Sequence, residues 1–167
     1  PRCIVAGQLN QPMLLDFLLE NKMSGYFIDI GANHPSFNSN SYYFERFRKY
    51  TGYAFDPLGK YQTLWRETRP CTIFMNVAIG SENGDILFYE HENDDGWADQ
   101  LSYTASSDHP TQLGTPKTVQ MRRLDEFFGH SSQIDFASVD VEGAESDVLK
   151  GFGDKVRPKI VLLENCF

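Results

Sequence analysis

Acidic and amide side chains follow four apolar runs of the sequence, and residues of these types bind ligands and accept protons. They are Asp29, Asp56, Asp140 and the pair Glu164-Asn165, each at or next to the end of a run rich in aromatic and β-branched residues. Such runs are typical of buried strands in a parallel sheet. The carboxyl ends of parallel strands meet at one edge, where open α/β folds bind their ligands. One acid at a strand end is often a helix cap, but four together predict a site.

The first of these runs, residues 26–30, breaks into the small residues Gly-Ala-Asn at 31–33. A glycine in such a turn lets the backbone approach a ligand closely. The Ser-Asn-Ser segment at 39–41 then predicts the start of a helix that continues through Phe47. A strand, a turn of small residues and a helix N-terminus form the ligand-binding corner of an open α/β sheet.

Two further strand ends suggest where a nucleotide would bind. Asp56 follows the apolar run 53–55 and lies 25 residues beyond Gly31. In dinucleotide-type folds an acid at about this distance accepts hydrogen bonds from the ribose hydroxyls. The alternative for Asp56 is a cap for the helix that Pro57 begins. Asn76, near the end of the third predicted strand at 72–80, either lies on the ligand side or makes an ordinary hydrogen bond to the backbone.

Composition limits the classes of partner. The chain has 167 residues, 41% of them hydrophobic, and a net charge of −8. This acidic balance argues against binding to nucleic acid through phosphates. No apolar run is long enough to span a membrane and no signal peptide is visible. Three scattered cysteines, Cys3, Cys71 and Cys166, favour a reducing, cytoplasmic setting.

We expect a single domain over residues 1–167. Its predicted parts are an N-terminal helix at about 12–22, covering one face of the sheet, a cofactor half at 25–90, a variable loop at 91–117 and an acceptor half at 118–167. The Asn-Gly pair at 83–84 predicts a hairpin between the third strand and the strand 85–89. Within the variable loop, Trp97 is either a stacking surface for a sugar or aromatic substrate or a hydrophobic plug.

Several of these motifs, taken in order, resemble the FkbM family of S-adenosylmethionine-dependent methyltransferases. The motifs are Tyr26–Asn33, Ser39–Tyr42, Ala54–Pro57, Asn76–Gly80, Arg123–Phe127, Ile134–Phe136 and Asp140–Glu145. The last of them, Asp-Val-Glu-Gly-Ala-Glu followed by Val-Leu-Lys-Gly, is the most specific. The resemblance covers residues 25–165. It implies an α/β, Rossmann-like class I methyltransferase fold, with a mostly parallel sheet, helices on both faces and methyl transfer to a hydroxyl of a sugar or small natural product.

The resemblance also implies the residues that bind S-adenosylmethionine. The expected cofactor-binding residues are Asp29, Gly31, Asn33, Asn40, Asp56, Asn76, Val77 and Asp140. Among them Asp29, Gly31 and Asn33 would line the methionine part and Asp56 the ribose. Asn76 and Val77 would lie at the adenine, and Asp140 nearest the methyl group.

Two features of the chain depart from the family pattern. Where many members have a further glycine after the Gly-Ala-Asn turn, this chain has His34-Pro35. The chain also ends after its fifth predicted main-sheet strand, whereas the full fold adds an antiparallel pair. Either the chain is part of a longer one, or a second copy covers this C-terminal edge in a homo-oligomer.

The sulfonium methyl is already electrophilic, so the protein must align a hydroxyl and accept its proton. Candidate bases are Asp140 by position, Glu142, and His34, whose residue type titrates near neutral pH. The alternative for His34 is a turn residue beside proline. The acids Asp140 and Glu164 with Asn165 are also similar to the magnesium ligands of catechol O-methyltransferase, and hard oxygen ligands suit Mg²⁺.

Two other functions use the same fold. An NAD-binding oxidoreductase would share the ribose acid, but the first turn lacks a full Gly-x-Gly-x-x-Gly. A non-catalytic Rossmann-like module, having lost cofactor binding, is the stronger alternative because of His34-Pro35. The sequence favours a methyltransferase enzyme.

Overall fold

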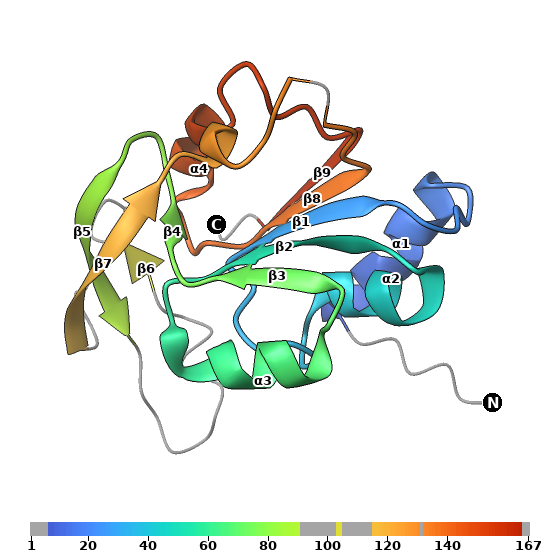
Figure 1. Cartoon of the computed structure of the whole chain (residues 1–167), viewed down its shortest axis with the longest axis horizontal. Helices are drawn as coiled ribbons and strands as arrows, with labels where there is room; N and C mark the ends of the chain where they lie inside the picture. The colour runs from blue at the N-terminus through green and yellow to red at the C-terminus, as the bar shows by residue number, and fades with distance from the viewer. Residues whose placement is uncertain (1–6, 91–102, 105–114, 131, 165–167) are drawn as a thin grey trace.

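The computed structural model describes residues 7–90, 103–104, 115–130 and 132–164, and its main sheet has five parallel strands (Figure 1). These are β1 (Tyr26–Ile30), β2 (Thr51–Phe55), β3 (Thr72–Met75), β8 (Phe136–Val139) and β9 (Ile160–Leu163), in the order β3-β2-β1-β8-β9. The chain first moves outward from β1 to β3 and then returns to the other side of β1. This reversal creates a switch point between β1 and β8, which confirms the predicted α/β class.

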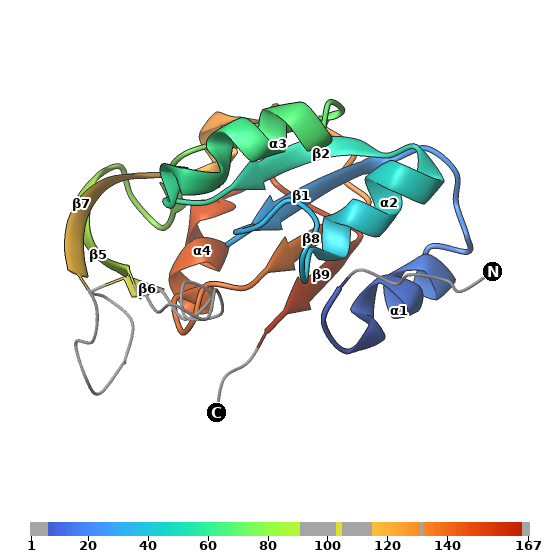
Figure 2. The same cartoon turned by 90° about the horizontal axis from the view of Figure 1, so that it is seen from below.

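Helices cover the main sheet (Figure 2), and the side chains of β1 alternate between two buried layers. Phe27 packs in a cluster with residues of α1 (Gln11–Leu18) and α2 (Asn40–Arg48). Ile28 and Ile30 pack on the other face, in the cluster that includes residues of η4 (Leu124–Glu126) and α4 (Glu145–Gly151). The helix α3 (Gln62–Thr68) covers the α2 face beside β2 and β3. Asp29 therefore belongs to the α2 face, where it needs a polar partner from a helix.

The N-terminal helix is shorter than predicted. It ends at Leu18 and not near residue 22, because Glu20 and Asn21 both have φ of 55°, which is incompatible with a right-handed helix. Leu15 and Leu19 are buried in the α1–α2 cluster, so the prediction that this helix covers one face of the sheet is confirmed.

The predicted hairpin at residues 83–84 does not form. β4 (Ala78–Ile79) and β5 (Gly84–Glu90) do not pair with each other, because β7 (Thr115–Arg122) lies between them. With β6 (Tyr103–Thr104) they make a second sheet, in the order β4-β7-β5-β6, at one end of the molecule (Figure 1). An Asn-Gly pair is a local signal, and the long-range pairing with β7 overrides it.

The second sheet also corrects two predicted boundaries. The third predicted strand is interrupted at Asn76, where the chain leaves the main sheet. The predicted variable loop at 91–117 contains β6 and the first residues of β7. Trp97 lies outside the described residues, so its predicted role stays a prediction.

The described helices and the outer strand bear on two predictions about partners. In the parts of the chain that the structure covers, every helix is too short or too polar to cross a lipid bilayer. Among the described residues β9 is the last strand at its edge of the main sheet. The predicted pairing of this edge with a second copy stays a prediction.

Candidate active site

Each strand of the main sheet is followed at its carboxyl end by a residue of the predicted site. Asn76 follows β3, Asp56 follows β2, Gly31 follows β1, Asp140 follows β8 and Glu164 follows β9. Because all five strands are parallel, these ends lie along one edge of the sheet. The structure thus brings together the strand ends that the sequence singled out.

The turn after β1 is fixed by close backbone packing. Gly31 has φ of 77°, and its N–H donates to the carbonyl of Phe55 at 2.9 Å. A Cβ atom at this position would lie 1.7 Å from the carbonyl oxygen of Asp140. The glycine therefore allows the end of β1 to approach the end of β8, at the switch point of the sheet.

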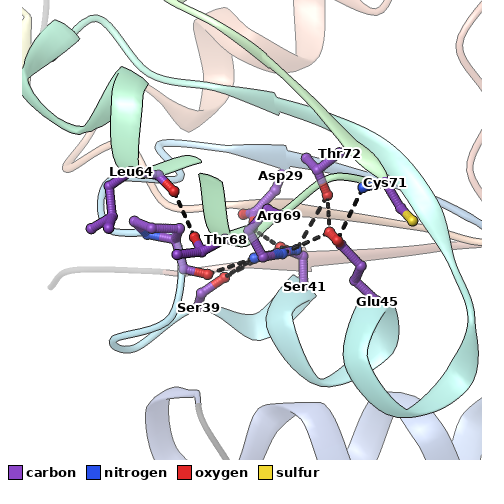
Figure 3. A network of polar contacts seen from close by, with 10 residues as sticks. Asp29, Ser39, Ser41, Glu45, Leu64, Thr68, Arg69, Cys71 and Thr72 are labelled. Atoms are coloured by element: carbon purple, nitrogen blue, oxygen red, sulfur yellow. Dashed lines mark hydrogen bonds and ion pairs between the residues drawn. The ribbon is translucent and has the colours of Figure 1, made fainter. Parts of the chain in front are cut away.

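Asp29 is a buried carboxylate with a helix partner, as its place in β1 requires (Figure 3). The hydroxyl of Ser41, in the first turn of α2, donates to its Oδ2. Burial raises the pKa of Asp29, while the Ser41 hydrogen bond and the positive charge of Arg69 oppose this rise. The Asp29 carboxylate is thus bound by a hydroxyl in the first turn of α2, and the charge of the buried Arg69 stabilises its ionised form.

Asp56 joins the turns after β1 and β2. Its Oδ2 accepts the N–H of Asn33 at 2.8 Å, and its Oδ1 accepts the N–H of Leu58 at 2.7 Å. The second bond closes a tight turn before η2 (Gly59–Tyr61), whose N-cap is Leu58 and has no side-chain cap bond, so the helix cap that the sequence left open for Asp56 is replaced by this turn. An ionised carboxylate has about four acceptor positions and can accept from ribose hydroxyls as well as from backbone N–H groups.

Asn76 closes the same region from β3. Its Nδ2 donates to the backbone carbonyl of Asp56 at 2.9 Å, which is the backbone bond that the sequence left open. A Cβ atom on Gly59 would lie 3.0 Å from Asn76 Oδ1, so the amide packs against the η2 backbone. Its neighbour Val77 packs against the core cluster on the α4 face.

Asn40, the first residue of α2, carries a buried acceptor without a partner among the described residues. Its Nδ2 donates to Gln11 Oε1 at 2.8 Å and to Ser138 Oγ at 3.2 Å, but its Oδ1 makes no hydrogen bond. An unsatisfied buried carbonyl is costly, and such atoms are often found where a ligand donates to them.

His34 organises the turn that departs from the family pattern. Its Nδ1 accepts the backbone N–H of Ser36 at 3.2 Å and of Phe37 at 3.0 Å. Its ring packs edge-on against Tyr61, with 5.0 Å between the centroids. A neutral imidazole that accepts through Nδ1 carries its hydrogen on Nε2. His34 would therefore have to give up the turn bonds to act as a base.

We expect His34→Ala to lower the free energy of unfolding by about 1–2 kcal/mol, because two backbone N–H groups lose their acceptor. Chemical denaturation would measure this change. The exposed His130 provides the control, since His130→Ala should leave stability within about 0.5 kcal/mol of the wild type. Equal effects of the two substitutions would mean that the turn does not depend on the imidazole.

Asp140, at the end of β8, is a strongly perturbed acid. Burial, a hydrogen bond with Glu164 and the charges of Glu164, Glu142 and Asp29 raise its pKa from 3.8 to about 9. Glu142 has φ of 50°, a left-handed conformation that is uncommon for this residue type. Perturbed acids and strained backbone in a turn at a switch point are typical of functional sites.

The predicted magnesium ligands are only partly described. Asp140 and Glu164 share a hydrogen bond, but Asn165 lies outside the described residues. Within the described segments no group of three or more His, Cys, Asp or Glu side chains is arranged to hold a metal ion.

The sequence reasoning missed Arg69, which lies beneath the site. The side chain is only 1% exposed and contacts the 35–41 segment and Glu45. The nearby Arg66 is exposed, and nothing in the sequence distinguishes the buried arginine from the exposed one.

Comparison with known proteins agrees with this architecture. The family model described as "Methyltransferase FkbM domain" matches residues 29–167. A crystal structure of methyltransferase FkbM from Methylobacillus flagellatus KT is similar in fold, with a TM-score of 0.51 and 14% identity. The match covers 83% of this chain and 32% of that chain, so this chain spans about a third of its length. The search of curated proteins gave no match. Because the family model covers most of the sequence, the chain belongs to the FkbM methyltransferase family.

Proposed function

We propose that the protein is an S-adenosylmethionine-dependent O-methyltransferase that acts on a hydroxyl of a sugar or small natural product. Family membership supports methyl transfer as the reaction. The observation that carries the proposal is the convergence of Asp29, Asp56 and Asp140 at one edge of the parallel sheet, around the switch point between β1 and β8. This edge is where ligands bind in open α/β sheets.

The donor and acceptor set fits the cofactor. S-adenosylmethionine presents an amino group, two ribose hydroxyls and an adenine amine, all of which donate hydrogen bonds. The site offers carboxylate acceptors at Asp29 and Asp56, and a buried, unsatisfied amide oxygen at Asn40. Acceptors of this kind are favourable partners for such donors, above all for a charged amino group.

We assign the roles along the sheet edge from β8 to β3. Asp29, Gly31, Asn33 and Asn40 would hold the methionine part, and Asp56 the ribose. Asn76 and Val77 would lie at the adenine, with Asp140 next to the acceptor hydroxyl. The order follows the strand order β8-β1-β2-β3, which makes each assignment testable at a separate strand end.

The bound cofactor supplies an electrophilic methyl group on a sulfonium. The residues of this chain then have to align the acceptor hydroxyl and receive its proton. We propose Asp140 as the base, with Glu142 beside it, because the hydrogen bonds of His34 Nδ1 commit that ring to the turn. In the resting protein Asp140 holds a proton, so it acts as a base only once the site has ionised it.

The first test is a calorimetric titration of the protein with S-adenosylmethionine. We expect wild-type protein to bind it and Asp56→Ala to bind about 10-fold more weakly or worse, the loss expected when a charged hydrogen-bonding partner is removed. Asp56→Asn keeps an acceptor for the Leu58 N–H but removes the negative charge. It therefore distinguishes the effect of losing this hydrogen bond from the effect of losing the charge. Asp154→Ala, at a side chain that is 99% exposed, is the control.

The same titration separates the alternatives. Heat with NAD and none with S-adenosylmethionine would favour an oxidoreductase, and folded protein that binds neither would favour a non-catalytic module. If the cofactor binds, transfer of a labelled methyl group to a panel of sugars and small alcohols tests the acceptor class. Repeating the panel with Mg²⁺ and with a chelator tests the proposed magnesium ligands Asp140, Glu164 and Asn165.

A further inference from the structure

A buried arginine at the end of α3 connects three segments beneath the candidate site (Figure 3). Arg69 Nε donates to Glu45 Oε2 in α2 at 2.7 Å, and its Nη1 donates to the carbonyl of Pro35 at 2.6 Å. Its Nη2 donates to Ser41 Oγ at 3.1 Å and to Thr72 Oγ1 at 3.4 Å. One guanidinium thus bonds to the loop after β1, to α2 and to the start of β3.

The ion pair with Glu45 offsets part of the charge of Arg69 but does not explain the other bonds. A guanidinium is a rigid fork of five N–H donors, and here the fork is directed at the 35–41 segment as well as at the acid. The adjacent Trp65 ring lies 4.8 Å from the guanidinium carbon, and the Trp65 Nε1–H donates to the carbonyl of Asn33 at 2.8 Å. Arg69 and Trp65 therefore both bond, from the α3 side, to the backbone of the loop that follows β1.

The bond to Ser41 leads directly to a predicted cofactor residue. Ser41 is fully buried, accepts from Arg69 Nη2 and donates its own hydrogen to Asp29 Oδ2. A hydroxyl that accepts from a cation becomes a stronger donor to the next acceptor. Two consecutive hydrogen bonds, Arg69 to Ser41 and Ser41 to Asp29, thus connect the buried arginine to a buried carboxylate that the arginine itself does not contact.

We propose that Arg69 is a positioning residue that acts through Ser41 to orient Asp29, and to favour its ionised form, as an acceptor for the amino group of the cofactor. This inference rests on the proposed function. Burial alone favours the neutral form of a carboxyl group, and a neutral Asp29 would attract an ammonium group far less. Arg69 supplies the opposing charge through Ser41, from the end of α3.

Opposing influences act on the pKa of Asp29. Burial is the largest of them and raises the pKa, whereas the Ser41 hydrogen bonds and the charge of Arg69 lower it and so reduce the rise. Within the described segments a second charged group that interacts with Asp29 is Asp140, at the end of the adjacent strand β8. That acid favours the neutral form of Asp29 when it is ionised, so Arg69 is the cation that counteracts both effects.

A matched pair of substitutions separates this role from simple packing. Ser41→Ala and Thr72→Val each remove one hydroxyl that accepts from the same Nη2 of Arg69. Only Ser41 passes a hydrogen bond on to Asp29, because the Thr72 hydroxyl donates to Glu45. In protein without cofactor, ¹³C NMR of the Asp29 carboxyl should show a midpoint raised by about one pH unit in Ser41→Ala and unchanged in Thr72→Val.

Arg69 itself is tested in two ways. Arg69→Lys keeps the charge but loses the fork, so we expect it to raise the Asp29 midpoint as Ser41→Ala does. In the wild type, where no substitution can unfold the protein, the ¹⁵N resonances of the Arg69 guanidinium should shift with the midpoint of Asp29. Guanidinium resonances that ignore this titration, or an Arg69→Lys protein that behaves like Thr72→Val, would overturn the inference.

Calorimetry with S-adenosylmethionine completes the test. Ser41→Ala and Arg69→Lys should weaken binding about 10-fold at pH 7, with a smaller deficit at higher pH, where Asp29 is ionised in all variants. Thr72→Val should bind as the wild type does. If the wild type does not bind S-adenosylmethionine, the proposed function and the cofactor role of Arg69 both fail, whereas unchanged NMR midpoints with normal binding would overturn the Arg69 role alone.

Discussion

Gly31→Ala is expected to lower the free energy of unfolding by at least about 3 kcal/mol, and to abolish S-adenosylmethionine binding by any protein that remains folded. Two independent effects add at this residue. The φ of 77° costs an L-residue about 1–2 kcal/mol. The new Cβ would also lie 1.7 Å from the Asp140 carbonyl oxygen, so the ends of β1 and β8 must separate.

Chemical denaturation of the variant and of Gly84→Ala provides the comparison. Gly84 begins β5, its φ is not positive, and a Cβ there meets no atom within 4 Å. The same change of residue type should therefore be neutral or slightly stabilising at Gly84, by about 0–1 kcal/mol. Similar losses at both glycines would show that the contact between the two strand ends is not a constraint on the fold.

The main sheet could be predicted because its signals are local. Each strand is a short apolar run that ends in a polar residue, as at Asp56 and Asp140, and a parallel sheet brings such ends to one edge. The alternation within β1 also determines that Asp29 lies on the helix α2 face, opposite Ile28 and Ile30.

What could not be predicted depends on contacts between distant segments. The Asn-Gly pair at 83–84 is a correct turn signal in isolation, but β5 pairs with β7, whose residues lie between 25 and 37 positions later than their partners. Arg69 is similarly hidden, because its partners Pro35, Ser41 and Glu45 all come from an earlier part of the chain. The types and the spacing of side chains in the sequence do not reveal such contacts between distant segments.

Asp56 and Asn76 each fit both a structural and a functional interpretation. The sequence offered a cap or a ribose ligand for Asp56, and a backbone bond or a ligand-side position for Asn76. The structure contains the backbone bond of Asn76 and, for Asp56, a turn-closing bond from the Leu58 N–H in place of a helix cap. Both groups lie at the ligand edge of the sheet, and a carboxylate or an amide can make several hydrogen bonds at once, so a structural bond at a strand end does not oppose the proposed role.

Asp140→Asn is expected to make the protein more stable as the pH rises, relative to the wild type. The folded pKa of about 9 lies above the ordinary value of 3.8, so between these values folded Asp140 keeps a proton that the unfolded chain has lost. Rising pH therefore favours the unfolded wild type, whereas asparagine does not titrate. The advantage of the variant should be small at pH 5 and grow by about 2–4 kcal/mol by pH 8.

Urea denaturation at both pH values measures this difference, with Asp154→Asn as the control at an acid that is 99% exposed. The control should show no growing advantage, since the carboxyl is fully solvated. An Asp140→Asn advantage that is equal at pH 5 and pH 8 would mean that Asp140 ionises normally.

Asp140→Asn also tests why the protein has the acids Glu142 and Glu164 close to Asp140. If Asp140 accepts the proton of the acceptor hydroxyl, Asp140→Asn should reduce methyl transfer by about 100-fold or more while leaving S-adenosylmethionine binding within about 3-fold. A residue whose replacement raises stability and lowers turnover is retained for chemistry and not for folding. The charges of Glu142 and Glu164 then have a reason to remain beside it, because together with burial they raise the pKa of Asp140 and so make its ionised form a stronger base.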